Sequence, residues 1–117
     1  MSKTANKTIN IAKDFSPYPA GRVRGDGPNS GERFRDDFLI PALRAGHVDV
    51  VVDGVAGLPS SFYEEAFGGL VRAGFRLDEL KQHLAIVANS ERMSIYPNLG
   101  WKYMAEEFDR VSGSKAN

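Results

Sequence analysis

The sequence contains no cysteine, so disulfide bonds, thiol catalysis and thiolate metal sites are excluded. Its two histidines, His47 and His83, are isolated from each other and suggest no metal cluster. No apolar run approaches the roughly 20 residues that span a bilayer, and the first residues lack the apolar core of a signal peptide. We therefore expect a cytoplasmic protein with no metal, no cofactor and no membrane contact.

The sequence also lacks an excess of charge of either sign. Fifteen Lys and Arg residues balance fifteen Asp and Glu residues, so the formal net charge is zero. Proteins that bind nucleic acid usually carry a basic excess, and this balance argues against a general nucleic-acid binder. A low net charge offers little electrostatic resistance to self-association, so the composition is compatible with a homodimer.

Segments of high β-propensity alternate with segments of helical periodicity along the chain. Strands are predicted at residues 8–12, 48–52 and 84–88, and helices between Asn29 and Gly46 and at residues 61–73, 77–82 and 98–111. Three valines in succession suggest that residues 48–52 form a central strand that is covered on both faces. The alternation predicts an α/β fold in which helices pack on a mostly parallel sheet of four to five strands.

The length of 117 residues suits a single domain. We predict that this domain spans residues 7–111. The small polar residues of segments 1–6 and 112–117 predict disordered tails at the two ends.

Residues 14–31 contain three prolines and four glycines, which predicts a long loop, either uninterrupted or with a short strand around residues 22–24. Asn29 and Glu32 fit a capping box at the start of the helix that follows. Pro41 lies inside that helix and predicts a kink or a break into two shorter helices, because its ring clashes with the preceding turn.

The glycine-rich stretch 25–32 leads into this helix, and Arg22, Arg24 and Arg33 lie beside it in the sequence. Such loops and helix starts can hold phosphate groups, so the stretch is a candidate site for a nucleotide or another anion. The Gly-Lys-Ser/Thr end of a P-loop is missing, which favours a flexible loop flanked by solvated surface arginines. Both interpretations stay open at the level of the sequence.

The predicted strand 48–52 leads through a Gly/Pro turn to Ser60 and Ser61. Ser61 and Glu64 fit a second capping box, in which each side chain accepts a hydrogen bond from the other residue's amide. A hydroxyl at a helix start also lies beside free amides and the positive end of the helix dipole, which stabilise a phosphate. The serines are therefore candidates both for a helix cap and for a phosphorylation site.

Enzymatic chemistry is not expected at this turn. The nucleophile-elbow pattern Gly-x-Ser-x-Gly is missing around Ser60 and Ser61. Asp53 follows the central strand, where some α/β proteins place a phosphate-accepting aspartate. The further acidic residues that would hold magnesium are missing, so a turn-forming Asp-Gly pair is favoured.

Gly68 and Gly69 lie inside the predicted helix 61–73, where each glycine costs about 1 kcal/mol relative to alanine. Close packing of the helix on the sheet would offset this cost. The alternative is a flat face that receives a partner, in which case the chain would be a structural subunit that self-associates through Tyr63, Phe67 and Gly68.

The stretch Asp53-Gly54-Val55, Leu58 and Pro59-Ser60-Ser61-Phe62 resembles the turn of STAS domains, which are found in anti-sigma-factor antagonists and sulfate-transporter tails. The segments SSFYEEAFGGL and GPNSGERFRDDFLIPAL are closer still to a bacterial STAS-like family of unknown function. The resemblance covers about residues 8–90. It departs from the antagonist pattern where Pro59 replaces an aspartate and Phe62 replaces a glycine.

The resemblance implies a single STAS-like domain that acts as a non-enzymatic regulatory protein–protein interaction module. It places the phosphoacceptor at Ser61, with Ser60 as the weaker candidate, and implies a protein partner such as a histidine-kinase-like ATPase. Residues 53–64 would form the docking surface, with partner contacts from Asp53, Leu58, Pro59, Phe62, Tyr63 and Glu64. The alternative functions are a nucleotide or anion-binding domain that uses the loop 21–32, and the self-associating subunit.

Overall fold

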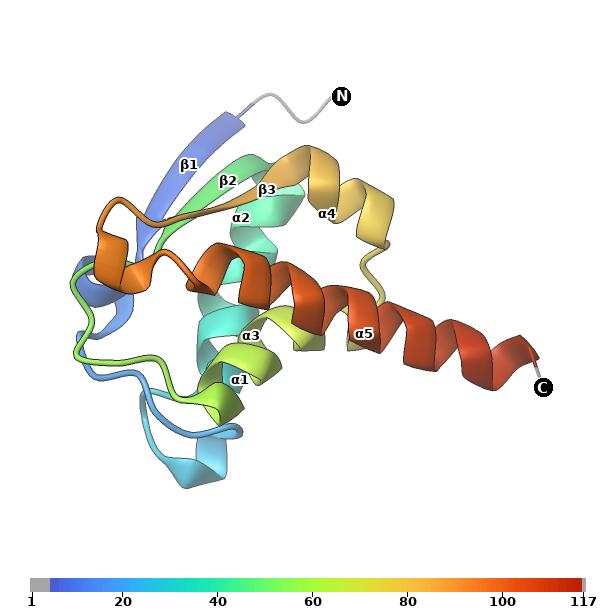
Figure 1. Ribbon diagram of the computed structural model, residues 1–117, viewed down its shortest axis with the longest axis horizontal. Coiled ribbons are helices and arrows are strands. Elements are labelled where there is room, and N and C mark those ends of the chain that lie inside the picture. Colours follow the sequence, from blue (N-terminus) through green and yellow to red (C-terminus); the bar gives the residue numbers. More distant parts are fainter. Residues whose placement is uncertain (1–4, 117) are drawn as a thin grey trace.

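The computed structural model describes residues 5–116, and within them it contains one parallel three-stranded sheet (Figure 1). The strands are β1 (Ala5–Asn10), β2 (Gly46–Val51) and β3 (Leu84–Val87), in the spatial order β1-β2-β3. The helices are α1 (Gly31–Phe34), α2 (Ile40–Ala45), α3 (Ser60–Arg72), α4 (Leu77–His83) and α5 (Tyr96–Ala116). Short helical turns are η1 (Ile11–Phe15), η2 (Arg24–Asp26), η3 (Arg35–Leu39) and η4 (Glu91–Met93). The α/β class and parallel sheet are confirmed, but the predicted strand number of four to five is wrong.

The central place of β2 is confirmed, because it pairs with β1 on one side and β3 on the other. The prediction that both of its faces are covered is wrong. Ile9, Val50 and Ile86 point into the core, and burial alternates along β2. Helices α2 and α5 lie on the side of these core residues, and the opposite face, which includes Val51, is only half-buried (Figure 1). Valine suits a strand on either face, so a run of valines does not by itself indicate a two-sided cover.

The first strand ends earlier than predicted. The Asn10 side chain accepts a hydrogen bond from the Lys13 amide at 3.1 Å, and the Asp14 carboxylate accepts one from the Asn10 amide at 2.8 Å. These local contacts cap the π-helical turn η1, so the chain leaves the sheet after Asn10. Ile9 and Ile11 are nevertheless both buried, as their spacing predicts.

The loop 14–31 contains no strand around residues 22–24. The Asp26 carboxylate accepts hydrogen bonds from the Arg22 and Val23 amides, and this closes the 3₁₀ turn η2. The cap of α1 is Ser30 rather than Asn29, because the Ser30 hydroxyl accepts from the Arg33 amide at 3.2 Å. The Asn29 side chain donates instead to the Tyr18 carbonyl at 3.2 Å.

The irregularity predicted at Pro41 is present as the π-helical turn η3, which separates α1 from α2. The Ile40 amide donates to the Arg35 carbonyl, five residues back, just before the proline that cannot donate. Gly46 ends α2, as predicted, and its amide donates to the Ala42 carbonyl.

Helix α5 lies across α3 and covers it (Figure 1). Tyr63 and Phe67 of α3 are fully buried, and the Tyr63 hydroxyl donates to the Tyr96 carbonyl at 2.6 Å. Burial raises the pKa of the Tyr63 hydroxyl, which therefore stays protonated. The predicted self-association face of Tyr63, Phe67 and Gly68 is thus inside the domain, because α5 occupies it.

The ordered elements extend beyond the predicted domain bounds of 7–111. Strand β1 begins at Ala5, and α5 continues to Ala116. Residues 1–4 and 117, which belong to the predicted tails, lie outside the described residues. None of the helices within residues 5–116 is long and apolar enough to cross a membrane.

Candidate functional site

The turn after β2 is tied to the loop after β3 by Asp53. Its carboxylate accepts hydrogen bonds from the Ser90 hydroxyl at 2.6 Å and from the Asn89 and Ser90 amides at 2.7 and 2.8 Å. The Ser90 hydroxyl is the largest cause that holds the pKa of Asp53 below its usual value, and the Asn89 amide adds to it. Asp53 therefore serves the chain's own structure, and its carboxylate is engaged within the chain rather than presented to a partner.

The pKa of Asp53 implies that this tie contributes stability that depends on pH. A carboxyl group with a lowered folded-state pKa stabilises the fold above the unfolded-state value of about 3.9, and this contribution is lost as the pH falls through the folded-state pKa. We expect the free energy of unfolding to fall on acidification, and to fall less in Asp53→Asn. Urea denaturation at neutral and acidic pH checks this, and equal losses in both proteins would contradict it.

Two hydrogen bonds that involve the backbone of the turn hold the rest of it in place. Arg92 donates to the Val55 carbonyl at 2.8 Å, and the Ala56 amide donates to the Pro17 carbonyl at 2.8 Å. The turn therefore lies against the loop that carries Tyr18. It ends at Pro59, which is the N-cap residue of α3.

Helix α3 begins at Ser60 and has no side-chain cap. The predicted capping box of Ser61 and Glu64 is therefore wrong. The helix starts one residue earlier than predicted, so Ser61 is its second residue, and Glu64 turns toward arginines instead. Ser60 is exposed and Ser61 is half-buried. The two serines lie beside the unbonded amides that a helix leaves at its start.

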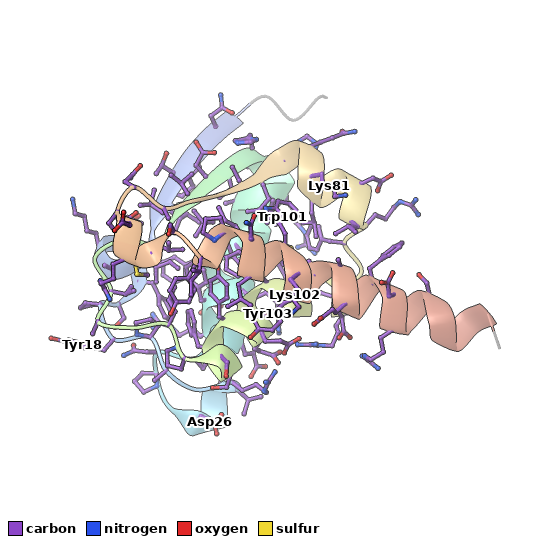
Figure 2. All side chains as sticks on the ribbon, in the orientation of Figure 1. Tyr18, Asp26, Lys81, Trp101, Lys102 and Tyr103 are labelled. Carbon is purple, nitrogen blue, oxygen red and sulfur yellow. The ribbon has the colours of Figure 1, made fainter. Side chains whose placement is uncertain are left out.

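Half of the predicted docking residues lie in the core. Leu58 is 6% exposed and Phe62 and Tyr63 are 0% exposed, so a partner cannot reach them in this structure. The spacing of these apolar residues is that of a stripe that packs on a core, and in this structure they fill the core rather than form a docking surface. The exposed residues around the turn form what we call the turn surface: Pro17, Tyr18, Ala56, Pro59 and Ser60. Tyr18 projects outward from it (Figure 2) and is 69% exposed.

Glu64 and Glu65 of α3 form an ion-pair network with arginines. Arg72 reaches Glu64 at 2.8 Å and Glu65 at 3.0 Å, and Arg22 contacts both carboxylates. Burial raises the pKa of Glu64, but hydrogen bonds from Arg72 and Arg22 outweigh it, so the net direction is downward. Arg35, only 12% exposed, is also paired with Glu65.

This network explains Gly68 and Gly69. A Cβ atom on Gly69 would lie 3.1 Å from the Arg35 Cδ and closer still to its Nη1, and one on Gly68 would collide with the Glu64 carboxylate. The prediction that the helix packs closely on the sheet at the two glycines is therefore wrong, because the close neighbours of both positions are charged side chains. Sequence reasoning missed Arg35 and Arg72 as members of the network. The one signal of this network in the sequence is the spacing of Arg72. It follows Glu65 by seven residues and Glu64 by eight, so it lies on the same face of the helix as both.

The three predicted anion-binding arginines are paired with carboxylates of the chain itself. Arg22 binds Glu64 and Glu65, and Arg24 binds Asp37 at 2.8 Å. Arg33 lies 3.8 Å from Asp37, and its guanidinium lies over the Phe15 ring at 5.1 Å. Their side chains therefore do not converge on an open anion site.

Within residues 5–116 no three His, Asp or Glu side chains gather in a way that could hold a metal ion. A hollow of about 380 Å³ lies between α2 and Lys7, away from the turn surface.

The fold and the turn together define a small α/β domain that presents an exposed turn and an uncapped helix start at the carboxyl end of its central parallel strand. The chain belongs to the family described as STAS-like domain of unknown function (DUF4325), whose model matches residues 30–92. The match spans α1 through α4 and β3, and it ends before α5. No curated protein and no solved structure matched the chain.

Proposed function

We propose that this chain is a non-enzymatic regulatory module that binds a protein partner through the turn surface. The observation that carries the proposal is the exposed start of α3, where Pro59 and Ser60 follow the central strand without a side-chain cap. Loops at the carboxyl ends of parallel strands are the usual binding place of open α/β sheets. Membership of the STAS-like family supports a role like that of anti-sigma-factor antagonists.

The proposal revises which residues contact the partner. Tyr18 and Pro59 are exposed, and the hydrogen bond from the Ala56 amide to the Pro17 carbonyl ties together the two segments that carry them, so they supply the apolar part of the surface. Tyrosine is favoured in interfaces because it combines apolar area with a polar tip. Leu58, Phe62 and Tyr63 act only by supporting the turn and helix from beneath.

A phosphate on Ser60 or Ser61 would switch this contact. It would add a charge of about −1.5 to −2 beside the positive end of the α3 dipole, where the amides at the helix start can donate hydrogen bonds to the phosphate oxygens. Ser60 is exposed, whereas Ser61 is half-buried, so Ser60 is the more accessible of the two to a kinase. The partner that fits this role is a histidine-kinase-like ATPase that both binds the turn surface and phosphorylates it.

The docking step is tested with the histidine-kinase-like ATPase encoded nearest to this gene. We expect Tyr18→Ala and Ser60→Arg to weaken binding about tenfold or more, as loss of a central interface contact does. Ser94→Ala is the matched control, because Ser94 is an exposed serine whose hydroxyl only donates to the Glu91 carbonyl. Equal binding by all of these variants would remove the turn surface from the proposal.

The switch is tested separately with ATP and phosphosite mapping by mass spectrometry. We expect phosphate on Ser60 or Ser61 and weaker binding of the phosphorylated form. Absence of phosphate at both serines, with binding retained, would reject the switch while the docking role stands.

A further inference from the structure

The carboxyl-terminal half of α5 extends past the rest of the domain (Figure 1). Two adjacent hollows, of about 360 and 280 Å³, lie where this half passes the end of α3 and the start of α4, and both are lined by Arg76 and Phe108. We call them together the α5 groove. Its apolar lining residues are Val71, Phe75, Leu77, Phe108 and Val111.

The groove leaves apolar side chains partly in water. Phe75, Leu77 and Phe108 are half-buried, although each packs against the edge of the core. Covering such surface is favourable because it removes apolar area from water. Partly covered aromatic residues in a concave place are typical of an interface that a further helix completes.

We propose that the α5 groove receives the α5 helix of a second copy of this chain, which forms a two-fold symmetric dimer. The groove is self-complementary because α5 is itself one of its walls, so a two-fold axis that brings one α5 into the groove brings the other in as well. The two helices run antiparallel, and Phe108 of each copy packs against Leu77 of the other. This surface is separate from the turn surface, so the dimer leaves partner docking open.

The charged residues at the rim of the α5 groove are placed to form ion pairs with a second copy of the chain. Arg76 is 70% exposed at the α4 side and is held there by Asp78 at 3.2 Å. Lys81 lies on α4 beside the groove (Figure 2) and has no carboxylate partner within residues 5–116. On α5, Asp109 follows Phe108 directly and is exposed. In the antiparallel arrangement Asp109 of each copy approaches Lys81 of the other, and the zero net charge of the chain adds no general repulsion.

Sedimentation velocity of the full chain from low to high micromolar concentration tests the dimer. We expect a monomer–dimer equilibrium that shifts toward dimer as the concentration rises. Asp109→Lys should weaken it about tenfold or more, because it places like charges opposite each other. Glu91→Lys is the matched control: it makes the same change from an acidic residue to lysine at an exposed position of η4, which does not line the α5 groove.

The charge-swapped double variant, Asp109→Lys with Lys81→Glu, should recover the dimer, because it restores opposite charges at both symmetric contacts. Four results would overturn the proposal. The first is a wild-type chain that stays monomeric throughout, and the second is equal weakening by Asp109→Lys and Glu91→Lys. The third is a double variant that fails to recover. The fourth is a dimer that Val87→Lys dissociates and Asp109→Lys does not, which would place the contact on the open face of the sheet.

Discussion

Replacing Phe62 by alanine is expected to lower the free energy of unfolding by about 3–5 kcal/mol, the usual cost of removing a fully buried phenylalanine. Phe62 is 0% exposed, and its ring lies 5.8 Å from Phe34 and 5.9 Å from Phe15. Its removal would therefore leave a cavity between α3, α1 and η1. Urea denaturation followed by circular dichroism measures the loss.

Tyr18→Ala provides the control for this result. Tyr18 is also aromatic and also lies near the turn, but it is 69% exposed, so the same truncation should change the free energy of unfolding by only about 0.5 kcal/mol. Comparable losses in the two variants would contradict the assignment of Phe62 to the core. The comparison matters for function, because loss of partner binding in Phe62→Ala would report unfolding, whereas loss in Tyr18→Ala would report the interface.

The periodicity of the sequence predicted most of the fold. The alternation of β-branched and helical segments placed β2, α3 and β3 to within one or two residues. Gly46 marked a helix end, and Gly74, which follows the C-cap residue Ala73 of α3, has the positive φ of 109° that such a position favours. These features depend on neighbours a few residues away in the chain, which a sequence pattern contains.

The role of Glu64 could not be predicted in the same way. Ser61 and Glu64 match the spacing of a capping box, but Arg22 approaches Glu64 from 42 residues earlier in the chain, and Arg72 approaches it from eight residues later. Two charged hydrogen bonds outweigh one bond to the Ser61 amide. The turn and the start of α3 could therefore be placed from the sequence, while the contacts of their side chains depended on segments that are distant in the chain.

Asp53 shows the same limit. The Asp-Gly pair after β2 predicted a turn, and the turn is present, but the partners of the carboxylate are Asn89 and Ser90. Only the parallel pairing of β2 with β3 brings these residues together. The exposed fractions of Leu58 and Phe62 were likewise undetermined, because an apolar stripe has the same spacing whether it meets a core or a partner.

Replacing Gly31 by alanine is expected to cost about 3 kcal/mol, although it adds a single methyl group. Gly31 is the first residue of α1, and a Cβ atom there would overlap the Phe62 carbonyl oxygen and lie 2.9 Å from the Glu65 Cβ and 3.1 Å from the Ala66 amide nitrogen. Two of these three atoms belong to the α3 backbone, which cannot rotate away as a side chain can. The new methyl group therefore has to push α3 away from α1.

Gly25→Ala is the matched control, because no atom lies within 4 Å of the Cβ that it would add. This variant should be neutral, or more stable by up to about 1 kcal/mol since alanine restricts the unfolded chain. Urea denaturation of both proteins measures the difference, and similar stabilities would show that α1 and α3 are not in close contact. Because α3 begins at Ser60, a Gly31→Ala protein that still folds should also displace the turn surface and bind its partner more weakly, whereas Gly25→Ala should bind normally.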